Sequence, residues 1–347
     1  MRSPDYSVQV FLWGNPNLDR DLQLAKQGGF TWIKQMLQWN YIEGQGKGKY
    51  EWNEPDRIAK AAQQAGLRVL ARVDIAPLWA RDKSTDPKLS GPPQNVEEFA
   101  DFIYALVDRY KKGSPNGQIS AFQIWNEPNL AFEWAGLTPD PLAYTKLLKA
   151  AYQAAKRADP DAVIISAGLS PTTARGAVAM PDTEFLQKMY DAHANDYFDV
   201  LGVHGAGYKA PPEVSPDDIA ADLRYNHGEP AAGRIYGFRH VEDMRKIMVA
   251  NGDAAKRVSV LEFGWTSDPR PDSPYKWHSV SEQEKADYTV RAFQFAKANW
   301  TPWIGTMNLI YIADPLWTEK NEQYYWAITG PDGSLRPAYN AFQQMPK

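Results

Sequence analysis

Eight short apolar runs alternate with eight longer amphipathic segments along almost the whole chain. Short apolar runs bounded by turn residues are typical of buried strands, and apolar residues spaced three or four apart are typical of helices. A strict strand–helix order predicts a parallel sheet, and eight units without a seam favour a closed barrel over an open sheet. We therefore expect one α/β domain, a (β/α)8 barrel that spans residues 1–347.

Turn residues separate the expected elements. Strands are expected at 8–13, 31–37, 67–74, 120–126, 162–167, 198–204, 257–262 and 304–312. Helices are expected at about 17–28, 54–65, 95–112, 139–158, 183–195, 238–251, 282–299 and 337–344. Ser281 and Glu284 have the spacing of a capping box, and Thr138–Pro139 is typical of a helix start. The long connections all follow strands, so they should extend the barrel face that carries the C-terminal strand ends; they are 75–94, 129–137, 205–237 and 264–280.

Two glutamates stand where expected strands end. The run at 120–126 leads to Glu127, and Pro128, which has no N–H for a sheet, ends the strand at about that point. The run at 257–262 places Glu262 at a second strand tip. Strands 4 and 7 lie on roughly opposite sides of a barrel mouth, so the two carboxyls are expected to face each other. Two opposed carboxyls are what cleavage of a glycosidic bond requires.

The tetrapeptide Trp-Asn-Glu-Pro occurs twice, so its letters alone are weak evidence. The copy at 52–55 follows a Gly/Lys-rich loop and leads into a helical pattern, where Glu54 suits the first helical turn. The copy at 125–128 ends an apolar run. Context therefore predicts a structural role for Glu54 and a catalytic role for Glu127.

The sequence Ile-Trp-Asn-Glu-Pro-Asn at 124–129, together with Leu-Glu-Phe-Gly-Trp at 261–265, resembles the retaining glycoside hydrolases of clan A. Family 39 and its barrel-only relatives are the nearest. The likeness covers almost the whole chain and includes residues 39–43, 48–52, 203–205 and 333–339. It implies a (β/α)8 hydrolase that cleaves a β-type O-glycosidic bond in an oligo- or polysaccharide with net retention.

The resemblance also implies roles for five residues. Glu127 would be the general acid/base and Glu262 the nucleophile. Asn126 would bind the 2-hydroxyl of the sugar at the cleavage point. His204, at the end of strand 6, would line the pocket, and Trp317, just after strand 8, would be the floor on which the sugar stacks.

The chain departs from the family pattern at two places. Lys34 stands where the family usually has an Arg near the nucleophile, and it keeps the charge without the bidentate guanidinium. Arg72 is the alternative for that role, although it could instead pair only with Asp74. Tyr208 comes two positions later than the Tyr that the family often has, so which Tyr supports the nucleophile stays open.

Thirteen Trp residues are many for 347 residues, and most are expected in the core. Trp79 and Trp265, which follow strands, are further candidates for stacking on sugar rings. Family 39 barrels often carry an additional β-sandwich, for which this length leaves no room.

Composition bears on several other functions. A net charge of -4 supplies no basic surface for nucleic acid or anionic membrane, and no apolar stretch approaches the roughly 20 residues needed to span a bilayer. There is no Cys, and the five His residues show no metal-ligand spacing. We expect no cofactor and no metal, and a carbohydrate as partner. The oligomeric state is open, with a monomer favoured. The compartment is open, with an extracellular location favoured over a cytoplasmic one.

Two other functions compete with the hydrolase. A non-catalytic carbohydrate-binding barrel would keep an aromatic cleft without a working acid pair. A barrel enzyme of another class, such as a metal-dependent hydrolase or an aldolase, would need a His/Asp cluster or a strand-6 Lys at the mouth. The sequence leaves open the sugar and its linkage, exo or endo action, hydrolysis or transglycosylation, and the removal of a signal peptide or further domains.

Overall fold

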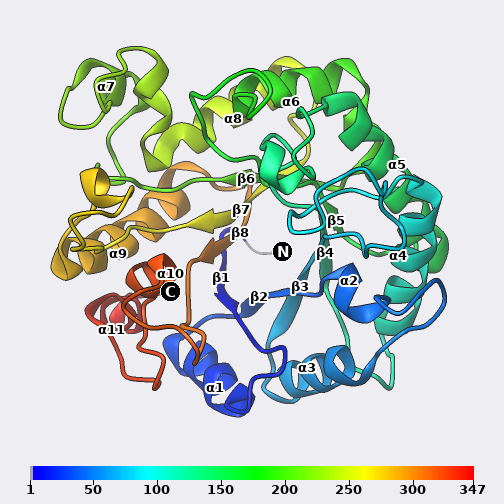
Figure 1. Ribbon diagram of the computed structural model, residues 1–347. Helices are drawn as coiled ribbons and strands as arrows, with labels where there is room; N and C mark the ends of the chain where they lie inside the picture. The colour runs from blue at the N-terminus through cyan, green and yellow to red at the C-terminus, as the bar shows by residue number, and fades with distance from the viewer. Residues whose placement is uncertain (1–2) are drawn as a thin grey trace.

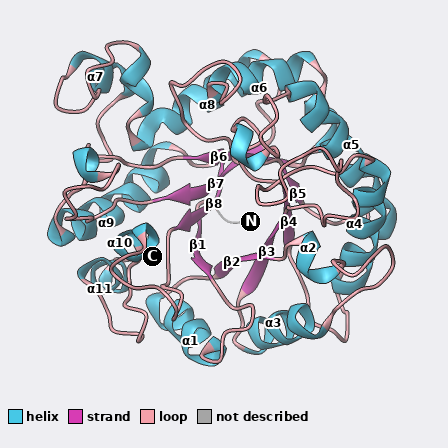
Figure 2. Cartoon of the chain, viewed as in Figure 1, coloured by secondary structure: helices cyan, strands magenta, loops and turns pink. Residues whose placement is uncertain are grey.

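The computed structural model describes residues 3–347 and has a closed parallel barrel at its centre, with the strands in the order β1 to β8. The strands are β1 (Asp5–Val10), β2 (Trp32–Met36), β3 (Arg68–Val73), β4 (Ala121–Ile124), β5 (Ile164–Ile165), β6 (Val200–His204), β7 (Arg257–Phe263) and β8 (Ile304–Leu309). Pairing of β1 with β8 closes the sheet. Figure 1 shows the helices as a ring around these strands, and Figure 2 shows the strands at the centre. The expected (β/α)8 fold is confirmed.

All eight expected helices are present. They are α1 (Leu18–Gly28), α3 (Asn53–Gln64), α4 (Val96–Tyr110), α5 (Pro141–Ala158), α6 (Asp182–Asp191), α8 (Val241–Ala250), α9 (Glu282–Asn299) and α11 (Pro337–Gln344). Short helices that the sequence did not predict lie in connections after β2, β6 and β8; they are α2 (Trp39–Ile42), α7 (Pro216–Ala221) and α10 (Glu322–Trp326). No helix within residues 3–347 has the length and apolar character needed to cross a membrane.

Helix starts follow the capping residues. The Ser281–Glu284 capping box is present at α9, as predicted. The predicted start of α5 at Thr138–Pro139 was wrong by two residues, because Asp140 caps the helix and Pro141 occupies its first turn. The same polar-residue–proline pattern occurs twice in succession there, and a carboxylate is the stronger N-cap.

Several strands are shorter than predicted: β5 covers only Ile164–Ile165 of the expected 162–167, and β8 ends at Leu309 instead of 312. The shifts in β1 and β4 bear most on the mouth of the barrel. β1 ends at Val10, so the apolar residues at 11–13 belong to the following connection instead of the sheet. β4 ends at Ile124, three residues before Glu127, although Trp125 N still donates to Val73 O at 2.8 Å. Apolar aromatic residues continue past the strand in both cases, and for that reason the hydrophobic pattern did not mark where pairing stops.

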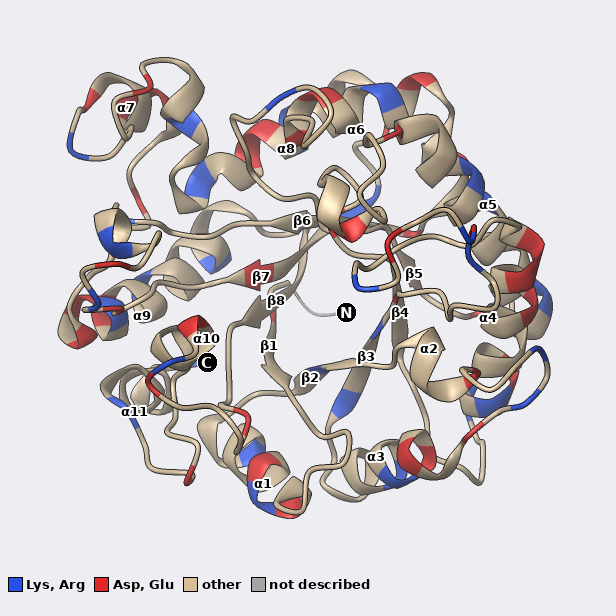
Figure 3. Ribbon diagram, viewed as in Figure 1, with Lys and Arg blue, Asp and Glu red and all other residues tan. Residues whose placement is uncertain are grey.

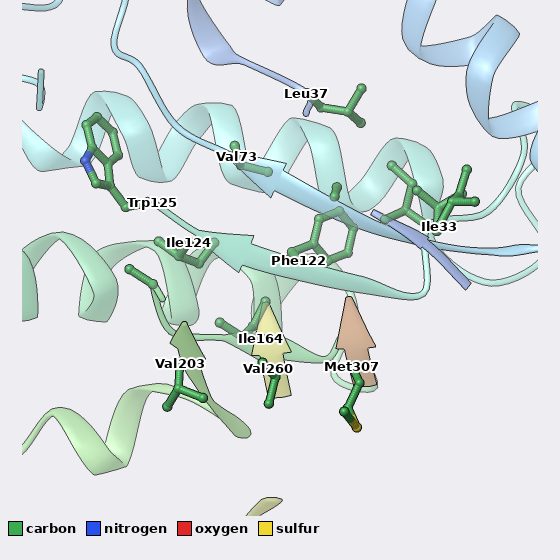
Figure 4. Close-up of a cluster of buried hydrophobic side chains, with 14 of the residues drawn as sticks. Ile33, Leu37, Val73, Phe122, Ile124, Trp125, Ile164, Val203, Val260 and Met307 are labelled. Carbon is green, nitrogen blue, oxygen red and sulfur yellow. The ribbon is translucent and has the colours of Figure 1, made fainter. Parts of the chain in front are cut away.

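The two faces of the barrel strands have different surroundings. Side chains on the outer face, such as Ile33, Phe122 and Val260, belong to the main apolar core under the helices (Figure 4). The inner face begins with a separate small apolar cluster, formed by Trp32, Leu70, Ala121, Ile165, Val200 and Leu261. Because side chains two apart share a strand face, the next inward positions on β2, β3 and β4 are polar; they are Lys34, Arg72 and Gln123. The barrel is therefore apolar at its base and polar toward the C-terminal strand ends.

Candidate active site

Glu262 lies on β7, where the strand pairing is irregular. The register with β6 shifts between Val203 and His204, and the register with β8 shifts between Val260 and Phe263. Such irregularities re-aim side chains. Consecutive residues of a regular strand point to opposite faces, but here two neighbours both reach inward. Leu261 belongs to the inner apolar cluster, and the Oε1 atom of Glu262 lies 2.9 Å from Nζ of the inward-pointing Lys34.

Two cations from across the barrel hold the Glu262 carboxyl. Lys34 is completely buried and donates both to Glu262 Oε1 and to Leu261 O, at 2.9 and 3.0 Å. Arg72 Nη1 lies 3.7 Å from the same Oε1, while its Nε donates to Asp74 Oδ2 at 2.5 Å. Acidic residues colour β7 and basic residues colour β3 in Figure 3. Lys34 and Arg72, treated as alternatives from the sequence, are thus both present, and Arg72 also pairs with Asp74.

The charge state of Glu262 follows from these contacts. Burial opposes its ionisation, but Lys34, His204 and Arg72 together outweigh burial and lower the pKa of Glu262 to about 2. Glu262 is therefore an anion across the neutral range, as a nucleophile must be.

Glu127 is held by backbone contacts at the mouth. Its N–H donates to Gly168 O at 3.0 Å, and its own carbonyl accepts from Leu130 N at 2.9 Å. The residue has a φ of 42°, and nearby Trp125 has a φ of 71°. Such left-handed conformations cost about 1–3 kcal/mol in a non-glycine residue and concentrate at functional sites. The contacts of the chain after β4 therefore enforce an unfavourable backbone at Glu127.

His204, the last residue of β6, contacts Glu127 and lies beside Glu262 on the neighbouring strand. Its Nδ1 lies 2.9 Å from Glu127 Oε1, and its Cα is paired in register with Glu262. Its Nε2 has no hydrogen-bond partner among the described residues, so Nδ1 is the ring nitrogen through which His204 contacts another side chain. The imidazole fits because residue 168 is Gly: a Cβ there would lie 2.2 Å from His204 Cδ2. His204 is thus bonded to Glu127 and is the strand neighbour of Glu262.

Asn126 and Trp317 are also placed at this end of the barrel. Asn126 is buried beside Glu127, and its Oδ1 accepts a hydrogen bond from Gln123 Nε2 at 3.3 Å. Trp317 is half-buried in the connection after β8 and packs edge-on against Phe11 and Tyr311, with ring centroids 4.7 and 5.4 Å apart. Trp317 is therefore part of an aromatic cluster contributed by the connections after β1 and β8.

Two other candidates from the sequence have packing contacts. Trp265 is completely buried, donates from Nε1 to Ala210 O at 3.0 Å and packs against Phe238, so its ring offers no face to a substrate. The prediction that Trp265 stacks on a sugar ring was therefore wrong, and Trp265 is a core residue. The sequence misled because an aromatic residue just after an apolar strand can point either into the mouth or outward under the helices. Trp79 is half-buried, and its Nε1 donates to Glu43 O at 2.7 Å, which ties the connection after β3 to the end of α2.

Two buried tyrosines, Tyr208 and Tyr311, are affected by the charges of the glutamates at the mouth. Burial raises the pKa of Tyr208, and Tyr236, Asp182 and, to a smaller extent, Glu127 add to the effect. The ring of Tyr208 stacks on that of Trp277, with centroids 5.8 Å apart. Burial also raises the pKa of Tyr311, and there Glu262 is the largest electrostatic contributor. Of the two tyrosines, Tyr311, in the connection after β8, is therefore the one whose pKa is affected by the charge of Glu262. Sequence reasoning missed Tyr311 because the predicted strand ran to residue 312, whereas β8 ends at Leu309 and leaves Tyr311 in the connection that follows.

Two further carboxyls that the sequence did not single out lie within electrostatic range of the pair. Glu133, in the turn after Glu127, has its pKa raised to about 7 mainly by burial. Burial likewise raises the pKa of Glu322 on α10, with Glu262 among the contributors.

Glu54, in contrast, pairs with Arg57 at 2.7 Å and accepts from Gly14 N, which confirms its structural role. Within residues 3–347, no group of three or more acidic, His or Cys side chains is arranged to hold a metal ion.

The sequence matches no protein-family model and no curated protein. Solved structures of similar shape include a family 39 glycoside hydrolase from the gut symbiont Bacteroides cellulosilyticus WH2, with a TM-score of 0.71 and 22% identity over 99% of this chain and 63% of that one. A glucosidase from Croceicoccus marinus has a TM-score of 0.69 and 14% identity, over 99% and 67%. A monomeric beta-xylosidase from Caulobacter crescentus CB15 has a TM-score of 0.64 and 19% identity, over 98% and 67%. The chain spans less than two thirds of the first of these proteins, and at such identities the likeness establishes a shared barrel fold.

Proposed function

We propose that the protein is a retaining O-glycoside hydrolase with Glu262 as nucleophile and Glu127 as general acid/base. The observation that carries the proposal is the contrast between the contacts of the two carboxyls. Glu262 is held as an anion by Lys34 and Arg72, whereas Glu127 is bonded to an imidazole that can supply or accept a proton. One charged and one proton-exchanging carboxyl are what double displacement at a sugar needs.

The reaction would proceed in two balanced steps. An oxygen of Glu262 bonds to the anomeric carbon while the bond to the leaving oxygen breaks, and the proton of Glu127 moves to that oxygen. Water then attacks the anomeric carbon, Glu127 takes its proton, and the bond to Glu262 breaks, so the product keeps the starting configuration. Asn126 would bind the 2-hydroxyl, and Trp317 with its aromatic neighbours would support the sugar ring.

Trapping the glycosyl-enzyme tests the proposal. The protein is incubated with activated 2-deoxy-2-fluoro sugars, starting with the β-xylosyl and β-glucosyl forms because similar solved structures include a beta-xylosidase and a glucosidase. We expect the intact mass to rise by one fluoroglycosyl group, and the labelled peptide to contain Glu262. The Glu262→Gln variant should remain unlabelled.

The acid/base role is tested by the dependence on the leaving group. Glu127→Ala should lower kcat/KM about 10²–10⁴-fold for a glycoside with a poor leaving group and far less for a dinitrophenyl glycoside, which needs no protonation. An equal fall on both substrates would reject Glu127 as the general acid/base. Sugar binding with no turnover and no mass shift for any fluorosugar would favour a non-catalytic carbohydrate-binding barrel instead.

A further inference from the structure

Gln123 points into the barrel next to one of the cations that hold Glu262. It is completely buried on β4, and its Cα is paired in register with Arg72 of β3, whose Nη1 lies 3.7 Å from Glu262 Oε1. Inward residues paired in register on neighbouring strands stand side by side. The Gln123 amide therefore belongs to the same polar layer of the barrel as Arg72, just before the segment that carries Asn126 and Glu127.

The amide nitrogen of Gln123 is identified by its partners. Nε2 lies 2.9 Å from Trp125 O and 3.3 Å from Asn126 Oδ1. A backbone carbonyl oxygen can only accept, so the amide atom that faces Trp125 O must be the nitrogen. If the Gln123 amide turned over, its Oε1 would meet Trp125 O, and two acceptors would face each other without a proton between them. The two protons of Nε2 are thus assigned, one to Trp125 O and one to Asn126 Oδ1.

The backbone on either side of Asn126 is held by neighbouring segments. Trp125 N donates to Val73 O at 2.8 Å, and Glu127 N donates to Gly168 O at 3.0 Å. These contacts fix where the side chain of Asn126 begins, but they do not determine the rotation of its amide, which exchanges Oδ1 and Nδ2. The hydrogen bond from the β4 amide determines that rotation: Oδ1 turns toward β4, and Nδ2 is presented on the opposite side.

From these contacts we propose that Gln123 is a positioning residue, which fixes the Asn126 amide so that Nδ2 donates a hydrogen bond to the 2-hydroxyl of the sugar at the cleavage point. The proposal rests on the proposed glycosidase function. A hydroxyl that accepts from Asn126 keeps its own proton for an acceptor, and the ionised carboxyl of Glu262 can only accept. The reversed amide would offer Oδ1 and take up that proton instead. The orientation set by Gln123 thus decides which group the 2-hydroxyl can bind.

Two variants at the end of β4 separate positioning from stability. Gln123→Met keeps the length of the side chain and removes its donors, whereas Tyr144→Phe removes the buried hydroxyl of α5 that donates to Ile124 O at 2.9 Å. Each variant leaves one carbonyl of this strand end without its side-chain donor, but only Gln123→Met frees the Asn126 amide. Both are compared with the wild type on dinitrophenyl β-glucoside or β-xyloside, whichever is cleaved faster, and on the matching 2-deoxy glycoside.

The ratio of kcat/KM for the hydroxylated and the 2-deoxy glycoside is the readout. We expect Gln123→Met to lower this ratio about 10-fold, through a fall in kcat for the hydroxylated substrate, because the Asn126 amide is then free to turn its donor away. Tyr144→Phe should change kcat/KM for both substrates by the same factor and leave their ratio unchanged. In the Asn126→Ala background, Gln123→Met should lower the ratio no further. A ratio in Gln123→Met that matches the ratio in Tyr144→Phe would overturn the proposal, even if its Tm were lower.

Failure of the wider hypothesis is read separately. If no fluorosugar labels Glu262 and no glycoside is cleaved, the hydrolase proposal fails. Gln123 is then judged by calorimetric binding of methyl β-glucoside and methyl 2-deoxy-β-glucoside to the wild type and to Gln123→Met. A preference for the hydroxylated sugar that falls about 10-fold in the variant supports the positioning role. An equal preference in both proteins, or no binding by either, rejects it.

Discussion

Glu262 is kept ionised by neighbours that lie far from it in the chain. Lys34 is 0% exposed and has Glu262 as its carboxylate contact, while Arg72 is shared between Glu262 and Asp74. A buried ammonium and a buried carboxylate each require the other, because either one alone would have to be neutralised to remain in the interior. The proposed nucleophile and its cation are thus a single unit at the residue scale.

Replacing Lys34 tests this dependence. In Lys34→Met the nearest cation is removed, so the pKa of Glu262 should rise from about 2. A nucleophile must be ionised, and activity is lost as pH falls through its pKa; the acid limb of kcat/KM should therefore move to higher pH in the variant. Full pH profiles measure the change, with Lys209→Met, an exposed lysine, as the control. An unmoved acid limb would show that Arg72 alone sets the charge of Glu262.

Gly168 is predicted to be required for the contact between His204 and Glu127. A Cβ at residue 168 would lie 2.2 Å from Cδ2 and 2.3 Å from Nε2 of His204, so Gly168→Ala must displace the ring. We expect a fall in kcat of about 10-fold or more and a stability loss of about 1–3 kcal/mol from overpacking. The double variant with His204→Ala supplies the control, since without the ring Gly168→Ala should add little further loss of activity. Additive losses would contradict the model.

At the scale of elements, the longest connection carries its own small core. Residues 205–237 bury Ala210, Ile219, Ile235 and Tyr236 together, and Tyr236 packs edge-on against Trp277 from the connection after β7. Figure 1 shows α7, within this segment, at the periphery of the molecule. The connections after β6 and β7 are therefore folded against each other on one side of the barrel, where the ring of Tyr208 also stacks on Trp277.

A buried ionic network fastens this segment to the helices. His240 Nε2 lies 2.7 Å from Asp182 at the start of α6, and its Nδ1 lies 3.3 Å from Asp243 on α8. Asp243 also binds Arg234 at 2.9 Å. His240→Ala leaves Asp182 buried without its partner, so we expect a loss of about 3–5 kcal/mol in the free energy of unfolding, measured by urea denaturation. A loss below about 1 kcal/mol would show that the network is not important for stability.

The same network makes stability depend on pH in a definite direction. Burial disfavours the imidazolium, but Asp182 and Asp243 outweigh burial and raise the pKa of His240 from 6.5 to about 9. Because the folded pKa exceeds the unfolded one, this contribution is complete below pH 6.5 and is lost as pH rises through about 9. The difference in unfolding free energy between wild type and His240→Ala should shrink over that window. A constant difference would mean that His240 is not charged in the folded protein.

At the scale of the whole molecule, one apolar core runs around the barrel under the helices, and it includes residues from β1 through α11. Closure of β1 on β8 joins the two ends of the sheet, so no part of the barrel can unfold without exposing its neighbours. We expect a single calorimetric transition, with the calorimetric enthalpy equal to the van't Hoff enthalpy. Two resolved transitions would show that the chain consists of separately folding units.

The sequence alone predicted the architecture, and it also supplied the two glutamates that we propose as the catalytic pair. Strand and helix periodicities depend on neighbours two to four residues apart, so eight units could be recognised without knowing their contacts. Parallel strands in a barrel all end on one face, and that rule placed Glu127 and Glu262 near each other once the strands had been counted. The same context assigned Glu54 to a helix, where it pairs with Arg57.

Only the tertiary structure decided which side chains meet inside the mouth. Periodicity marks Lys34 and Arg72 as inward residues, but the barrel's stagger and the irregular pairing of β7 determine that both reach Glu262. The burial of Trp265 and the effect of Glu262 on the pKa of Tyr311 depend in the same way on contacts between distant connections. Local sequence determines the direction of a side chain along its own strand, whereas its partners and its desolvation are set by chain segments up to 228 residues away.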